Sequence, residues 1–389
     1  MIKLISCIAF IVISGMTLQA NNIQVSNIYS ASTNTTLQYS MINCDISWDN
    51  SWRITGSAPD NWDAAWVFLK YRVGSTWYHA TLNTSSANYA APSGCSISAV
   101  SDGKGVFVYR STDGSGTFNA SSINLRWEYG LDGLAAGPAS VDEFCVFAIE
   151  MVYVPRGSFY VGDGMATWNY ATGEMGQFYT YPGISSPYQI TNNGSINVGT
   201  TAGYLNYYSN PTVPPNYVYS GDVSGPIPAE FPEGYEAFYC MKYEITQQQY
   251  VRFLNCLSYS QQAARTTSAP NFPAGSGALV NPNNYRSGID IMTPGVASTT
   301  PAVYACNLDN DTDYDDPDDG QSVACVPISW ADVAAYLDWT GLRPMTELEY
   351  EKACRGPLSP VGNEYPWGTT NIVGYTGNPA LTNEGTVNE

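Results

Sequence analysis

The chain has 389 residues, of which 13% are charged, and its formal net charge is −19 at pH 7. This charge argues against nucleic acid or an anionic membrane as a partner, because both are negative themselves. The length predicts two domains, each large enough for its own core. Thirty tyrosines are present, and tyrosine gives amphipathic contact area at low entropic cost. The composition therefore favours other proteins or glycans as partners, and it leaves a homo-oligomer or filament open.

The first twenty residues have the features of a secretory signal peptide. Lys3 supplies a short positive region, residues 4–16 are apolar but too short to span a bilayer, and the segment ends on Ala20. We expect residues 1–20 to be removed and the protein to be exported, to the cell surface or the extracellular space. No later segment is apolar over enough residues for a transmembrane helix.

Residues 21–145 predict an all-β domain. Short runs alternate polar and apolar side chains over residues 37–49, 64–73, 103–111 and 123–130, and turn sequences separate them. This spacing is typical of an antiparallel β-sandwich. Six tryptophans are expected to pack its core and rim, although an exposed aromatic platform for carbohydrate is a second interpretation: Trp48, Trp52, Trp62, Trp66, Trp77 and Trp127.

Residues 146–389 predict a second, α+β domain with long irregular loops, above all over residues 165–232. The segment 142–164 is strand-like, and no flexible linker precedes it. We therefore expect the two domains to be closely docked, with Phe144, Phe147 and Ile149 buried.

Three capping boxes predict helices in this second domain. The pairs are Thr246 with Gln249, Ser329 with Asp332, and Thr346 with Glu349. Ile245 and Tyr250 are placed for a hydrophobic staple across the first box, Gly341 ends the second helix and Gly356 ends the third.

An acidic run is the strongest candidate for a metal site. Seven aspartates fall within residues 309–319: Asp309, Asp311, Asp313, Asp315, Asp316, Asp318 and Asp319. Ca²⁺ takes six to eight oxygen ligands, and alternate aspartates suit it. We expect Asp309, Asp311, Asp313 and either Asp315 or Asp316 to be ligands. The run departs from an EF-hand loop at Tyr314 and Gly320, and a solvated acidic loop is the alternative.

Eight cysteines remain after the signal peptide, an even number that favours disulfides in an exported chain. Most pairings stay open. Cys306 and Cys325 bracket the acidic run, and we predict that they are joined.

Four segments of the second domain resemble the sulfatase-modifying factor family, which includes the formylglycine-generating enzymes. They are MVYVPRGSFYVG, FYCMKYEITQQQYVRFLN, VPISWADVAAYLDWTGLRPMTELEYEKACRGP and NEYPWG, and they follow the family order. The resemblance implies a C-type-lectin-like fold. It also places structural caps and buried ion pairs at Arg343, Thr346, Glu347, Glu349 and Arg355. It does not extend to the first domain.

The resemblance implies a copper-dependent oxidase only where the family's C-terminal cysteine pair is present. No such pair can be assigned up to Glu389, so this chain does not support copper. His79 is the only histidine, which excludes a site of two histidines and a carboxylate; we expect it to pack within a strand. The sequence favours a non-catalytic binding or assembly protein that uses the family domain as a loop-bearing scaffold. The alternative is a metal-dependent oxidase of the formylglycine-generating type with catalytic cysteines beyond residue 389.

Overall fold

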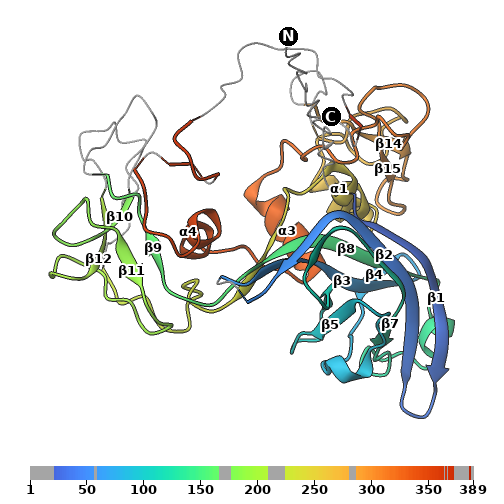
Figure 1. Cartoon of the computed structure of the whole chain (residues 1–389). Helices are drawn as coiled ribbons and strands as arrows, with labels where there is room; N and C mark the ends of the chain where they lie inside the picture. The colour runs from blue at the N-terminus through green and yellow to red at the C-terminus, as the bar shows by residue number, and fades with distance from the viewer. Residues whose placement is uncertain are drawn as a thin grey trace, which may run out of the picture.

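A computed structural model describes residues 22–56, 59–165, 177–208, 224–279, 286–362, 364–365, 367–371 and 385–386. These residues form a β-rich structure with few helices (Figure 1). The expected signal peptide, residues 1–20, lies outside the described residues. No helix among the described residues is long and apolar enough to cross a membrane.

The strands are β1 (Gln24–Asn34), β2 (Tyr39–Ile54), β3 (Asn61–Val73), β4 (Thr76–His79), β5 (Cys95–Ala99), β6 (Val106–Arg110), β7 (Gly114–Trp127), β8 (Glu143–Val154), β9 (Phe159–Val161), β10 (Gln177–Thr180), β11 (Tyr188–Ile190), β12 (Leu205–Tyr208), β13 (Phe238–Met241), β14 (Ile289–Thr293) and β15 (Val303–Cys306). The helices are α1 (Gln247–Leu254), α2 (Tyr259–Ala263), α3 (Trp330–Thr340) and α4 (Glu347–Arg355), with short 3₁₀ turns η1 (Ser86–Asn88) and η2 (Gly137–Ser140).

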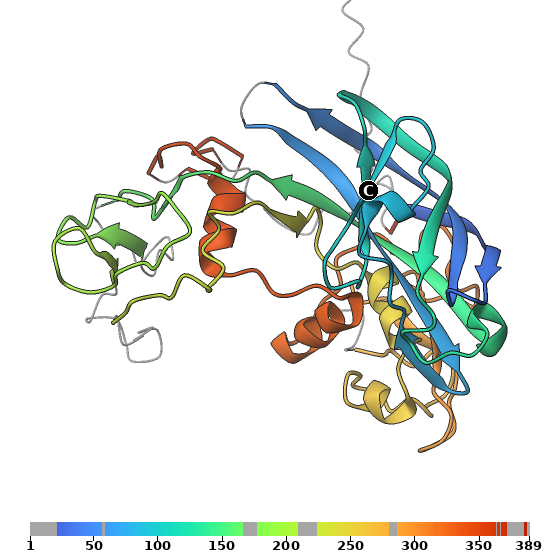
Figure 2. The ribbon, with the colours of Figure 1, turned by 90° about the horizontal axis from the view of Figure 1, so that it is seen from below.

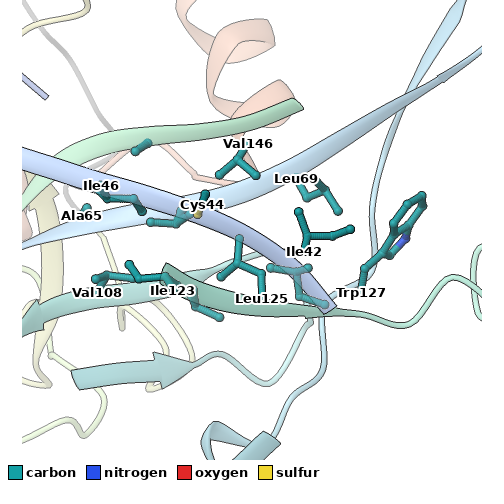
Figure 3. Packing of buried hydrophobic residues seen from close by; sticks show 14 of the residues in the cluster. Ile42, Cys44, Ile46, Ala65, Leu69, Val108, Ile123, Leu125, Trp127 and Val146 are labelled. Carbon is teal, nitrogen blue, oxygen red and sulfur yellow. The ribbon is translucent and has the colours of Figure 1, made fainter. Parts of the chain in front are cut away.

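The N-terminal region packs two groups of antiparallel strands around one core. Strand β2 pairs with β1 and β7, whereas β3 pairs with β4, β6 and β8. The two groups meet where β2 pairs with β3 at Arg53 and Trp62. Apolar residues from both groups, including Ile42, Leu69 and Leu125, fill the space between them (Figure 3). The predicted alternation of side chains produces this core, because every second residue of a strand faces inward.

Strand β3 is buried on both faces, and this joins the N-terminal region to the region after residue 146 that carries the four resembling segments, which we call the family region. Leu69 faces the core just described, whereas Trp66 and Phe68 belong to a second core with helices α1 and α3. The indole Nε1 of Trp66 donates a hydrogen bond of 2.9 Å to the carbonyl of Thr340, at the end of α3. The expected close docking is therefore present as a shared sheet with a helical layer against one face.

Strand β8 continues this connection. It pairs with β3 along its first ten residues and with β13 along its last four. Of the three side chains expected at the docking surface, Ile149 is buried, while Phe144 and Phe147 are half-buried and pack against different cores. The predicted domain boundary at residue 145 thus falls inside one continuous strand.

A separate lobe contains β9 to β12 and lies beside α4 (Figures 1 and 2). Its small core includes Phe159, Val161 and Ile190 together with Leu348 of α4. This lobe carries much of the segment 165–232 that was expected to be irregular. Its described part has only strands of three or four residues, while residues 166–176 and 209–223 lie outside the described residues.

All three predicted capping boxes are present, at the first turns of α1, α3 and α4. In each, the N-cap hydroxyl accepts the backbone N–H three residues on. Gly341 ends α3 in the left-handed conformation, with φ of 76°. A fourth box that the sequence analysis missed begins α2 with Ser258 and Gln261.

Candidate functional site

The acidic loop, residues 307–320, follows strand β15 and is held by its own aspartates. The backbone N–H of Asp313 donates to Asp311 Oδ1 over 2.6 Å, and that of Asp311 donates to Asp309 Oδ1 over 3.2 Å. Asp315 folds back on Cys306: its Oδ1 accepts the Cys306 N–H over 2.8 Å, and its own N–H donates to the Cys306 carbonyl over 3.0 Å. These turns fix where each carboxylate points.

Three carboxylates meet in this loop. Ligand oxygens of Asp309, Asp316 and Asp318 all lie within 4.8 Å of one another. Asp318 raises the pKa of the Asp316 carboxyl, because two carboxylates at hydrogen-bond distance favour one shared proton. Of the predicted ligands, Asp309 and Asp316 belong to this group. Asp311, Asp313 and Asp315 do not, and Asp318, which does, was not among the predicted ligands.

Asp319 adds a buried carboxylate beside this group. Its side chain is fully buried, its Oδ2 accepts the Asp316 N–H over 2.9 Å, and its Oδ1 has no hydrogen-bond partner among the described residues. The pKa of Asp319 is raised to about 6, mainly by burial, and the charges of Asp316 and Asp309 contribute to this rise. An unpaired buried carboxylate is costly, and a hard cation satisfies it. The set Asp309, Asp316, Asp318 and Asp319 therefore has the donor chemistry for Ca²⁺.

The cysteines that bracket the loop differ from expectation. Cys306 and Cys325 are both buried and both are free thiols, so the predicted disulfide is not formed in this structure. Burial raises the pKa of Cys325 to about 12. Burial also raises the pKa of Cys306, and Asp315, Asp319 and Cys325 add to this rise. The loop is held by the Asp315 hydrogen bonds instead.

A largely apolar cavity of about 930 Å³ lies between the N-terminal strands and the family region. We call the boundary between these two regions the seam, and this cavity the seam cavity. Its walls come from both regions, and they include Trp66, Phe107, Tyr239, Met241, Ile245 and Leu342. Phe107 and Tyr239 stack across the seam with ring centroids 3.8 Å apart. A cavity of this size and lining is in the range that accommodates organic ligands.

A cluster of buried charges also crosses the seam. Lys242 Nζ lies 2.9 Å from Glu150 Oε2 and 3.3 Å from Asp63 Oδ2. Asp63 also accepts hydrogen bonds from Trp48 Nε1 and Ser51 Oγ, each of 2.8 Å. Burial raises the pKa of Glu150, against the opposing effect of Lys242. Most of the charged atoms of this cluster have an ion-pair or hydrogen-bond partner, and we interpret the cluster as structural.

His79 and Trp62 are packing residues. His79 lies in β4, its ring stacks on Phe68, and its Nε2 contacts the Lys104 carbonyl over 2.6 Å. Burial and the charge of Lys70 lower the pKa of His79 to about 4, so the ring is neutral at pH 7. Trp62 has Tyr153 stacked at 3.8 Å and Arg53 at 4.6 Å from its ring centroid. Contacts of this kind do not leave Trp62 free as a platform for carbohydrate.

The model of the sulfatase-modifying factor enzyme 1-like domain family matches residues 140–385. The match covers more than half of the 389 residues, so the chain belongs to this family. The resemblance drawn from the four motifs is confirmed, and the match begins within a few residues of strand β8. Comparisons with curated proteins and with solved structures gave no match.

Of the side chains that the resemblance placed in structural roles, Arg343, Thr346, Glu349 and Arg355 make such contacts here, whereas Glu347 is exposed, and the Arg343–Glu349 ion pair is buried only on its Glu349 side. Arg343 Nη2 lies 2.7 Å from Glu349 Oε1, and Arg355 Nη1 donates to the Gly162 carbonyl over 2.7 Å. Thr346 caps α4 and also donates to the Pro232 carbonyl over 2.7 Å. Helix α4 is thereby tied to the lobe that contains β9.

Proposed function

We propose that the chain is an exported binding or assembly protein in which the family domain, with a C-type-lectin-like fold, is a non-catalytic scaffold fused to a β-sandwich. The seam cavity carries this proposal. It lies between two regions that share a sheet and a core, so its walls are fixed without a ligand. Preorganised walls lower the entropic cost of binding.

The cysteines among the described residues lack the properties of nucleophiles or copper ligands. Copper ligands and nucleophiles are thiolates, and burial opposes thiolate formation. Burial raises the pKa of Cys256 to about 12, of Cys95 to about 12 and of Cys145 to about 11. Each of the other five thiols also has a raised pKa, with burial as the largest cause: Cys44, Cys240, Cys306, Cys325 and Cys354.

We further propose that Ca²⁺ binds the acidic loop and orders it. The supporting observations are the convergence of Asp309, Asp316 and Asp318 and the unpaired, fully buried Oδ1 of Asp319. In this role the ion is structural. Oxygen ligands alone are typical of Ca²⁺ and not of copper.

The catalytic question has a direct test. The purified chain is incubated with copper and a cysteine peptide that a formylglycine-generating enzyme accepts, and mass spectrometry follows conversion of cysteine to the aldehyde. An active formylglycine-generating enzyme serves as positive control. We expect no aldehyde above the copper-only control, whereas conversion would replace this proposal with the oxidase alternative.

The seam cavity has a test of its own. We expect Phe107→Ala and Leu342→Ala to weaken binding of an environment-sensitive apolar dye, because both side chains line the cavity. Phe272→Ala is the control, since Phe272 is exposed and does not line the cavity. Equal dye binding by all variants, each shown to be folded, would contradict a ligand site at the seam.

A further inference from the structure

Lys70 occupies a position in strand β3 where the alternation predicts an apolar side chain. Trp66 and Phe68 precede it on the same face and belong to the second core. Lys70 is only 5% exposed. Its Nζ lies 5.4 Å from the ring centroid of Trp339, but among the described residues it has neither a hydrogen-bond acceptor nor a carboxylate at ion-pair distance. The Nζ atom is not fully buried, so an anion in the neighbouring cavity can reach this unpaired ammonium.

The pKa of Lys70 is lowered to about 8, mainly by burial and in part by the charge of Lys104, whereas Cys256 and Asp338 act in the opposite direction. The amine is therefore mostly charged at pH 7. This charge is retained although no side chain neutralises it at close range.

Lys70 lines a second cavity, of about 850 Å³, which we call the Lys70 cavity. Strands β3 and β4 form one wall, and the segments around α1, α2 and α3 form the other. Three of the 15 basic residues of the chain line it: Lys70, Lys104 and Arg265. Arg265 is paired with Asp332 at 3.1 Å. The carboxylates of Asp102 and Asp338 also line the cavity, and Asp338 is exposed.

Trp339 adds no second free donor to the Lys70 cavity, because its indole Nε1 is buried beside the Cys256 thiol. The Lys70 ammonium alone calls for an anionic acceptor. Hydroxyl groups of Ser75, Thr76 and Ser260 also line the cavity, together with the indole of Trp77.

We propose that the Lys70 cavity binds a small carboxylate-bearing sugar, that is, a sugar acid, with the Lys70 ammonium as counter-ion of its carboxylate. The hydroxyl and indole groups of the wall suit the hydroxyl-bearing ring, and the volume lies within the range of small-molecule sites. This site adjoins the seam cavity, with which it shares Asp102, Gly341 and Leu342, and it is separate from the acidic loop. It stands whether or not the family domain is catalytic.

The test is titration calorimetry of the whole chain with glucuronate, and with glucose as a neutral ligand of the same ring size. We expect glucuronate to bind at least about tenfold more tightly than glucose, and Lys70→Met to remove that difference. Equal binding of both sugars, absence of glucuronate binding up to roughly 10 mM, or unchanged binding by Lys70→Met would each overturn the proposal.

Two further readouts separate binding from folding. Lys70→Met removes an unpaired buried charge, so we expect the ligand-free variant to be at least as stable as the parent chain. Binding by the parent should weaken as pH rises above about 8, since Lys70 loses its proton.

The other groups near Lys70 do not change their charge in this pH range: His79 is already neutral, and Cys145 and Cys256 have pKa values of about 11 and 12. Lys104, Asp102 and Asp338 are tested separately as Met or Asn variants, and a pH profile that followed one of them would contradict the assignment to Lys70.

Discussion

Lys242 Nζ, in the family region, lies 3.3 Å from Asp63 Oδ2, in the N-terminal strand β3. Neither residue is exposed, and Glu150 completes the cluster at 2.9 Å from the same ammonium. The N-terminal strands therefore supply a counter-charge to the family domain. We expect the two regions to unfold together rather than as independent units.

Lys242→Met tests this expectation. Without the ammonium, two buried carboxylates lose their counter-charge, and we expect a loss of about 3–5 kcal/mol in the free energy of unfolding. Arg156→Met is the control, because Arg156 and Glu236 form an exposed pair at 3.1 Å and should contribute less than about 1 kcal/mol. Urea unfolding followed by tryptophan fluorescence measures both. Similar losses, or two separate transitions in the parent chain, would contradict the shared core.

Gly341 provides a second test of the same interface. Its φ is +76°, and a Cβ there would lie 3.0 Å from Lys104 Cβ and 3.3 Å from His79 Cε1, both in the N-terminal region. Gly133 has the same φ of +76° with nothing within 4 Å. Both glycine-to-alanine variants lose about 1 kcal/mol to the left-handed backbone. We expect Gly341→Ala to lose about 1–3 kcal/mol more, through crowding. If Gly341→Ala and Gly133→Ala lose the same stability in thermal unfolding, the neighbouring Lys104 and His79 side chains move aside without cost.

The buried thiols give a third prediction. Cys306 and Cys325 are 0% and 4% exposed, and burial raises the pKa of each. We expect neither to react with N-ethylmaleimide in the native protein, whereas the half-buried Cys354 reacts first. After unfolding in denaturant without reductant, both should become labelled, as peptide mapping by mass spectrometry can show. Labelling that required a reductant would mean that the protein forms a disulfide between Cys306 and Cys325, contrary to this structure.

The sequence predictions that were correct rested on local patterns. A capping box needs only residues three apart, so Thr346 and Glu349 could be recognised without any knowledge of the fold. Alternation in the same way indicated the inward residues of β2 and β3. It could not show that β3 has two buried faces. That depends on Trp66 reaching Thr340, 274 residues away in the sequence.

The acidic loop shows where sequence reasoning reached its limit. Spacing alone favoured Asp311 and Asp313, because it assumes that alternate aspartates point the same way. The hydrogen bonds between Asp315 and Cys306, together with φ of +62° at Asp315, turn the chain and bring Asp309 toward Asp316 and Asp318. The Lys70 cavity was missed for a similar reason: a lysine in an apolar row is informative only once its neighbours across the seam are known.

The last prediction concerns the acidic loop and its dependence on pH and calcium. Asp319 has a pKa raised to about 6, above its ordinary value of 3.8, so the folded state favours the protonated form. The protonated carboxyl of Asp319 stabilises the folded state fully below about pH 4, and this contribution is lost as pH rises through about 6. In calcium-depleted buffer the midpoint temperature of thermal unfolding should therefore decrease as the pH is raised from 4.5 to 7. A shift of this size corresponds to about 3 kcal/mol at most.

Calcium should reverse that trend, because the ion binds the ionised carboxylates of Asp309, Asp316 and Asp319. A tenfold excess over the dissociation constant stabilises the folded state by about 1.4 kcal/mol. We expect Asp319→Asn to be more stable than the parent chain without calcium at pH 7 and to lose most of the calcium response. Asp313→Asn is the control, since Asp313 lies outside the group of converging carboxylates, and it should respond like the parent. Thermal unfolding against calcium concentration measures all three. If the parent midpoint does not move with calcium, or if Asp313→Asn abolishes the response while Asp319→Asn keeps it, the ion does not bind at the converged carboxylates, and the buried charge of Asp319 is relieved by protonation alone.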